Sequence, residues 1–214
     1  MLNQPIQQRE DVRKQLIEVA ANLFHKHGIR SVTMDDIAHK MTMSKRTLYQ
    51  IFSDKEELLL ACVKEYENEE KWFSETLMQR TTSVLDFLLM LFAHKLSSMD
   101  SINPEFYIDI IKYPRVAEHI EQNKKKAEEF AVDFLNKGVE EGFFRKDVNY
   151  HIVVRQLLLG MDVFIQNSLI YEYPQTELFI NTVIPYIRGC STSKGIETID
   201  KFIVKQTEKL KSKD

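Results

Sequence analysis

Apolar positions recur at helical spacing along most of this chain, and residues that cap helices bound several of the segments. Thr33 and Ser44 are N-cap residues, Gly28 is a C-cap residue, and Pro185 predicts a kink within a late helix. The first ten residues are expected to form a polar arm. Together the pattern predicts an all-α protein with helices over 11–27, 33–40, 44–52, 55–79, 83–98, 105–112, 116–141, 150–171, 177–188 and 196–210.

Two short helices joined by a tight turn stand out within residues 31–60. One face of the second helix is apolar, with Leu48 and Phe52, and should pack inward. Its opposite face offers hydrogen-bonding groups that suit phosphates and base edges, among which Gln can pair with adenine or point along the backbone. The spacing predicts a helix-turn-helix that presents Lys45, Arg46, Tyr49 and Gln50 to DNA.

Three stretches resemble one known family in both order and spacing. They are Met34-Asp-Asp-Ile-Ala-His-Lys-Met before the turn, Ser44-Lys-Arg-Thr-Leu-Tyr-Gln-Ile-Phe after it, and Lys55-Glu-Glu-Leu at the next helix start. The segment from Arg13 to Val63 is therefore similar to the TetR-like transcriptional regulators. Thr42 departs from the pattern, because that family usually has glycine at this turn position. A residue with a Cβ adopts a left-handed conformation at some cost, so a strained or reshaped turn is expected.

The resemblance implies a DNA-binding site and a division of the chain. Phosphate contacts are implied for Thr33, Thr47, Tyr49 and Lys55, and base-edge contacts for Lys45 and Arg46. The complete set of predicted DNA-binding residues is Thr33, Ser44, Lys45, Arg46, Thr47, Tyr49, Gln50 and Lys55. Residues 1–55 are expected to form the DNA-binding domain, and residues 56–214 a helical domain for ligand binding and dimerisation.

Charge is divided between these two regions. Over residues 1–55 there are 9 Lys and Arg against 6 Asp and Glu, whereas the remainder has 20 against 26. The first region is thus net positive and the second net negative. This asymmetry fits a small phosphate-facing domain on a larger body, and the 43% hydrophobic content is enough for a core.

The helices predicted over 150–172 and 177–188 are apolar on more than one face. A second apolar face has to be buried somewhere, and a partner subunit is the economical solution. In proteins of the similar family the last two helices form a four-helix dimer interface. A two-fold dimer would also place two recognition helices about 34 Å apart, which matches a palindromic operator.

Ligand sensing is the second function that the resemblance implies. Aromatic residues at helical spacing belong more often to a core than to a pocket, and Asp162 with Gln166 could equally form a polar pair at a surface or dimer seam. A small-molecule effector is nevertheless expected. The candidate ligand-binding residues are His94, Phe106, Tyr107, Tyr113, Phe130, Phe134, Asp162 and Gln166.

Catalysis, a cofactor and a metal find no support in the motifs. A glycine-rich phosphate loop, a nucleophile elbow and an HExxH motif are missing, and the 6 histidines are scattered singly. Cys62 and Cys190 lack zinc or disulfide spacing and are expected to be packing residues. The apolar segments are too short or too often interrupted to span a membrane, so a cytoplasmic protein is expected.

These observations lead to one main hypothesis and one alternative. The main hypothesis is a homodimeric, ligand-responsive repressor of transcription that a small molecule releases from its palindromic operator. The alternative is an all-helical small-molecule-binding or adaptor protein whose DNA-binding head is not functional. Steep salt dependence of DNA binding would favour the first.

Overall fold

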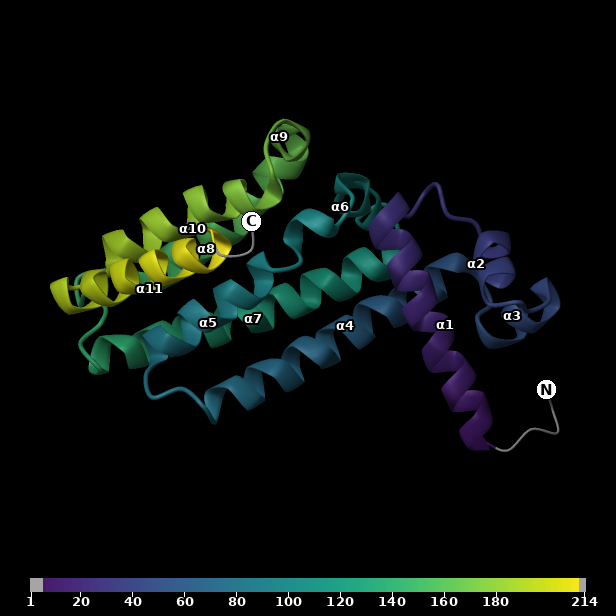
Figure 1. Ribbon diagram of the computed structural model, residues 1–214, viewed down its shortest axis with the longest axis horizontal. Helices are drawn as coiled ribbons and strands as arrows, with labels where there is room; N and C mark the ends of the chain where they lie inside the picture. The colour runs from purple at the N-terminus through teal and green to yellow at the C-terminus, as the bar shows by residue number, and fades with distance from the viewer. Residues whose placement is uncertain (1–5, 212–214) are drawn as a thin grey trace. The chain divides into compact units, whose positions relative to one another are not determined.

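The computed structural model describes residues 6–211, with side chains described for residues 9–204 except 161, 165 and 166. These residues form helices connected by short turns, and Phe144 and Ser191 form an isolated antiparallel bridge. The elements, which Figure 1 labels, are α1 (Ile6–His27), α2 (Met34–Lys40), α3 (Lys45–Ile51), α4 (Lys55–Met78), α5 (Val84–Leu96), η1 (Met99–Ser101), α6 (Pro104–Ile110), α7 (Pro114–Glu140), α8 (Tyr150–Gln166), α9 (Leu169–Glu172), α10 (Gln175–Cys190) and α11 (Ser193–Lys211).

The chain divides into two compact units. The first comprises the described residues up to Phe73 together with Ser101–Gln122, and the second comprises Ser74–Asp100 with the described residues from Asn123 onward. Helices α4 and α7 each contribute residues to both units. The boundary expected at residue 55 from the sequence therefore falls inside the first unit.

The first unit is built around a core that joins α1, α2, α3 and the start of α4. Figure 1 shows α2 and α3 next to each other, and α2 packs against both α1 and α3. Buried apolar side chains come from each of these elements, and Val116 at the start of α7 joins them. The fully buried members with the largest side chains are Phe24, Phe52, Leu16, Ile29, Ile37, Leu48, Leu58 and Leu59.

Helix α6 is tied to the end of α1 by polar contacts. The backbone N–H of Asn103 donates to the carbonyl of His25 at 2.7 Å, and the N–H of Arg30 donates to Asp109 Oδ2 at 2.8 Å. Gly28 ends α1 with a left-handed φ of 78°, as expected for a glycine at the C-terminal cap of a helix. A Cβ at Gly28 would lie 2.8 Å from Cβ of Glu105, so α6 also approaches this turn closely.

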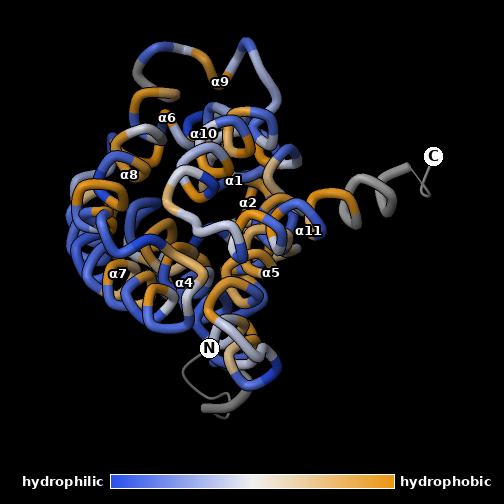
Figure 2. Tube along the Cα trace, turned by 90° about the vertical axis from the view of Figure 1, so that its left-hand side faces the viewer, coloured by the Kyte–Doolittle hydropathy of each residue, from blue (hydrophilic) through white to orange (hydrophobic). Residues whose placement is uncertain are grey.

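The second unit has a separate core contributed by α5, α7, α8, α10 and α11. Helices α8 and α10 pack together, and α11 packs on α5 and α10, where Figure 1 shows these helices running alongside one another. Figure 2 shows the amphipathic pattern as alternating orange and blue along the helical tubes. Gly195 allows α11 to approach the turn after α7, because a Cβ there would lie 2.3 Å from the carbonyl oxygen of Phe143.

Several helix limits differ from those expected. Helix α1 begins at Ile6, so the polar arm predicted over residues 1–10 is partly helical, and residues 1–5 lie outside the described part. The helix predicted over 150–171 stops at Gln166, because Ser168 adopts a left-handed φ of 61° before the short α9. Pro185 does lie inside α10. Both cysteines, Cys62 and Cys190, are buried and unpaired, which confirms the prediction that they are packing residues.

Candidate nucleic-acid interface

The first short helix of the motif, α2, begins with a complete capping box at Thr33. The Thr33 hydroxyl accepts the backbone N–H of Asp36 at 3.2 Å, and the Thr33 N–H donates to Asp36 Oδ2 at 2.8 Å. The same hydroxyl donates to Asp36 Oδ2 at 2.6 Å. These hydrogen bonds, first that from the hydroxyl and then that from the backbone, hold the pKa of Asp36 below its usual value. The predicted N-cap is thus confirmed and α2 starts at a fixed place.

The turn between α2 and α3 has the hydrogen bonds of a Schellman motif. The N–H of Thr42 donates to the carbonyl of His39 at 3.0 Å, and the N–H of Met43 donates to that of Ala38 at 2.9 Å. Thr42 has φ of 52° and so occupies the left-handed position that normally favours glycine. The turn therefore keeps the shape that glycine would give it, and the strain expected from the sequence is confined to one β-branched residue.

The second short helix, α3, begins at the N-cap Ser44, as predicted. Ser44 Oγ accepts the backbone N–H of Thr47 at 3.1 Å and lies 2.8 Å from the Thr47 hydroxyl. Leu48 and Phe52 are completely buried and anchor the helix on the core. The guanidinium of Arg13 on α1 lies 4.8 Å from the centre of the Phe52 ring, which adds a cation–π contact at the end of α3.

The opposite face of α3 is exposed and polar. Lys45, Arg46, Tyr49 and Gln50 are all accessible, and the Tyr49 side chain is large and 47% exposed. Lys45 Nζ lies 2.6 Å from Asp35 Oδ2 on α2, and both side chains are more than half exposed. The motif therefore offers a lysine, a guanidinium, a phenol and an amide on one short helix, which are groups that bind phosphates and base edges.

Lys55 has a different environment from the other predicted DNA-binding residues. It is partly buried, its ammonium donates to the carbonyl of Ile29, and Nζ lies 5.8 Å from the centre of the Phe24 ring. Burial lowers the pKa of Lys55, although the carboxylates of Asp109 and Asp36 act in the opposite sense. In this conformation Lys55 joins α4 to the loop between α1 and α2.

The candidate ligand-binding residues are distributed over both units. Phe106, Tyr107 and Tyr113 belong to the first unit, where Phe106 packs edge-on against His25 with ring centres 4.6 Å apart. In the second unit Asp162 binds Lys124 Nζ at 2.6 Å, and the Phe130 and Phe134 rings stack at 5.8 Å. His94, which is partly buried, also lies in the second unit, whereas the side chain of Gln166 is outside the described part.

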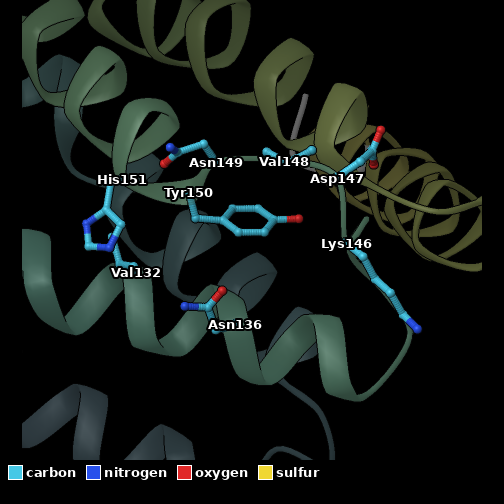
Figure 3. A pocket seen from close by; sticks show the side chains of 8 residues that line it. All are labelled: Val132, Asn136, Lys146, Asp147, Val148, Asn149, Tyr150 and His151. Atoms are coloured by element: carbon cyan, nitrogen blue, oxygen red, sulfur yellow. The ribbon is translucent and has the colours of Figure 1, made fainter.

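An open hollow of about 470 Å³ lies in the second unit, where α7 faces the start of α8. Figure 3 shows Tyr150 near the middle of this hollow, with Asn136 and His151 among the side chains around its ring. The Tyr150 hydroxyl donates to the Arg145 carbonyl at 2.7 Å, so the tyrosine closes the turn rather than reaching into solvent. None of the candidate ligand-binding residues lines this hollow, which is bordered by Val132, Asn136, Lys146, Asp147, Val148, Asn149, Tyr150 and His151.

Comparison with known proteins identifies the helix-turn-helix. The family model described as "Bacterial regulatory proteins, tetR family" matches residues 16–62, which contain the motif and the helices on either side of it. The repressor KstR2 of Mycobacterium tuberculosis is 28% identical over 151 residues, covering 67% of this chain and 74% of KstR2. Residues 16–62 therefore match the N-terminal helix-turn-helix domain of the TetR family of transcriptional regulators. This match and the similarity to KstR2 support a DNA-binding transcriptional regulator.

Solved structures of similar regulators share the fold over most of this chain. The structure of KstR2 of Mycobacterium tuberculosis superposes with a TM-score of 0.59 at 24% identity, covering 85% of this chain and 95% of that one. A TetR-family regulator from Agrobacterium tumefaciens has a TM-score of 0.71 at 12% identity, covering 86% and 100%. The TetR family thus accounts for an all-α fold with an N-terminal helix-turn-helix on a helical body.

Two contacts in the first unit were not predicted from the sequence. Asp35 on α2 binds Lys45, the first residue of α3. The guanidinium of Arg13 on α1 lies over the Phe52 ring. Both relationships join different helices, so periodicity within one helix carries no signal for them.

Among the described residues, no helix is both long and apolar enough to cross a membrane.

Proposed function

We propose that this protein is a homodimeric repressor that binds a palindromic operator and is released from it by a small molecule. The observation that carries the proposal is the exposed face of α3. Lys45, Arg46, Tyr49 and Gln50 stand on a helix whose start is capped by Ser44 and whose other face is buried. A rigid helix with donors on its free face is the arrangement that enters a major groove.

The contacts of each side chain suggest a division of roles on DNA. Lys45 and Arg46 are exposed and can donate to guanine, while Tyr49 can donate to a phosphate oxygen and Gln50 can meet adenine or the backbone. Ser44 and Thr47 are placed for phosphate contacts, because their hydroxyls are accessible at the start of α3. Thr33 and Lys55 are already engaged within the protein, so we expect them to position the motif more than to bind DNA.

The dimer part of the proposal rests on exposed apolar side chains of α8 and α10. Ile152, Leu159 and Val163 are 55%, 54% and 45% exposed and fall on one face of α8. Ile180 on α10 is 43% exposed and Tyr186 is 38% exposed. Large apolar groups gathered on neighbouring helices favour burial against a partner, and a two-fold axis there would give the operator its symmetry.

The effector part of the proposal concerns a small, largely apolar molecule. The predicted ligand residues are mainly aromatic, and the similar protein from Mycobacterium tuberculosis is described as a ketosteroid transcriptional regulator. Polycyclic and other apolar compounds are therefore the first effectors to test. Such a ligand can release the operator only by binding the low-affinity conformation more tightly than the DNA-binding one.

Selection of bound fragments from random genomic DNA, with and without candidate effectors, tests the proposal. We expect recovered fragments to share a palindrome and Tyr49→Ala to bind it at least tenfold more weakly. Tyr173→Ala is the matched control, because Tyr173 is 48% exposed but lies in the second unit. Operator affinity should fall steeply with salt. A plot of log K against log salt concentration should have a slope of about −0.9 for each phosphate that the protein neutralises.

The opposite results would support a different class of protein. If no fragment is enriched, or if affinity is insensitive to salt and to Tyr49→Ala, the DNA-binding proposal fails. A helical ligand-binding or adaptor protein would then be the better description. If a palindrome is enriched but no tested compound releases the protein from it, the repressor proposal stands. Only the tested classes of effector are then rejected.

A further inference from the structure

Asp35 is the one acidic residue of the segment 31–60, all of which the structure describes, that contacts the recognition helix α3. The other carboxylates of this segment have roles within the fold. Asp36 completes the capping box with Thr33, and Glu57 binds the backbone N–H of Ser53 at 2.7 Å. Asp54 and Glu56 both bind the guanidinium of Arg115. Asp35 instead reaches across the turn to Lys45, the first residue of α3.

Stability does not account for this ion pair. Lys45 Nζ and Asp35 Oδ2 are 2.6 Å apart, but the two side chains are 61% and 56% exposed. Exposed pairs of this kind contribute little to folding, because water screens the charges and two long side chains lose freedom. A carboxylate among the donors of a DNA-binding face also repels phosphates. Its placement there calls for a role on the DNA itself.

We propose that the Asp35–Lys45 pair reads a single G·C base pair in the major groove, which makes Asp35 a specificity-determining residue. This inference rests on the proposed binding of an operator by α3. Guanine presents the acceptor O6 beside N7, and cytosine presents the N4 amino donor next to that O6. O6 and N4 are hydrogen-bonded to each other, so they lie one hydrogen-bond length apart, as do Lys45 Nζ and Asp35 Oδ2. Lys45 donates to guanine while Asp35 accepts from cytosine.

An A·T pair fits the same two side chains less well. Adenine N6 is a donor beside thymine O4, but adenine N7 is an acceptor on the other side of N6 and repels a carboxylate. Cytosine N4 has only a carbon-bound hydrogen as its neighbour on that side. For guanine, N7 adds a second acceptor for the lysine. The pair therefore selects G·C in one orientation, with guanine on the side of Lys45.

Two steps test the assignment. Fragment selection is first carried out with the wild-type protein and with Asp35→Ala, and we expect one G·C position in each half-site to relax in the variant. That cytosine is then replaced, in the wild-type operator, by an analogue that lacks the N4 amino group. Wild-type affinity should fall about tenfold, the size of one good base contact, while the affinity of Asp35→Ala should change less than twofold.

Control variants separate specificity from folding. Glu69→Ala removes another exposed carboxylate from the first unit, on α4, and should leave base preference unchanged. Thermal unfolding of Asp35→Ala should match wild type closely, because the lost ion pair is exposed. If Asp35→Ala does not fold, Asp35→Asn replaces it, because the amide keeps the shape of the side chain and one acceptor oxygen. Asp35→Asn should partly relax base preference at the same position.

The results that would overturn the inference are distinct from those that would overturn the proposed function. Wild-type protein that enriches no DNA removes the proposed function. If the wild-type protein enriches an operator but Asp35→Ala relaxes base preference at no position, the proposed function stands. The proposal that Asp35 reads a base pair is then refuted. A relaxed position that is A·T, or an equal loss for both proteins on the analogue, also refutes it.

Discussion

Asp109 on α6 accepts the backbone N–H of Arg30, which is 79 residues away in sequence, at 2.8 Å. The carboxylate is almost completely buried and also binds Lys112 Nζ at 2.9 Å. Burial by itself would raise the pKa of Asp109, but the hydrogen bonds from Lys112 and Arg30 outweigh burial and lower it. The ionised carboxylate thus fixes the loop between α1 and α2 to α6, just ahead of the DNA-binding motif.

Replacement of Asp109 by alanine should destabilise the first unit by about 2 kcal/mol, because the partly buried N–H of Arg30 loses a charged acceptor. Asp109→Asn should cost less, since it retains an acceptor oxygen. Urea unfolding followed by circular dichroism measures both changes. Lys112→Ala is the control and should cost less than about 1 kcal/mol, because its ammonium is exposed. Equal losses for Asp109→Ala and Lys112→Ala would show that the bond to Arg30 contributes little.

Thr42→Gly should stabilise the protein by about 1 kcal/mol, since φ of 52° disfavours a β-branched residue. The gain is reduced by the greater freedom of glycine in the unfolded chain. Thr42→Ala serves as the matched control, because it removes the branch and hydroxyl but keeps the Cβ, and it should recover only part of the gain. Chemical denaturation provides the measurement, and a less stable Thr42→Gly protein would contradict the assigned strain.

Leu159→Glu should convert the expected dimer to a monomer at micromolar concentration. A charge at this position would be buried without a partner in an interface formed by α8 and α10, which costs several kcal/mol. Ile111→Glu is the control, because Ile111 is 57% exposed and lies outside these helices. Sedimentation velocity distinguishes the two states. An unchanged dimer in Leu159→Glu would remove α8 from the proposed interface.

The free energy of unfolding should decline as pH falls below about 6.5, because burial lowers the pKa of His25 from its usual 6.5. The folded state prefers neutral His25, so the unfolded chain binds the proton first. The stabilisation is therefore complete above pH 6.5 and is lost as pH falls toward the lower pKa of the folded state.

Denaturation curves between pH 7.5 and 5.5, a range about one unit either side of the ordinary histidine pKa, test this dependence. His25→Gln should flatten the profile over that range. His27→Gln should keep the wild-type profile, because His27 is exposed at the end of the same helix. An identical slope in wild type and His25→Gln would assign the titration to another group.

Local signals in the sequence predicted the DNA-binding motif well. Thr33 and Ser44 were expected to cap α2 and α3, and both do, because a cap depends on hydroxyl and amide groups only three residues apart. Leu48 and Phe52 were expected to be buried and are, since the helical period fixes which residues share a face. The break after Gln166 was missed, because neither glycine nor proline marks the left-handed Ser168.

The DNA-binding residues could be proposed from the sequence, but their states in the protein could not. Lys45 and Lys55 have the same side chain, and both were predicted to contact DNA. In the structure Lys45 is exposed beside Asp35, whereas Lys55 donates to the Ile29 carbonyl and is partly buried. The difference arises from neighbours on other elements of the fold, which the apolar pattern within one helix does not reveal.

The sequence by itself determined the all-α fold, the place of the helix-turn-helix and the caps that bound it, because these depend on interactions within a few residues. Only the tertiary structure decided that Asp35 meets Lys45 and that Asp109 holds Arg30. Each of these depends on how separate helices pack. Packing of apolar faces fixes the positions of the helices, and the polar contacts then follow from where those positions bring side chains together.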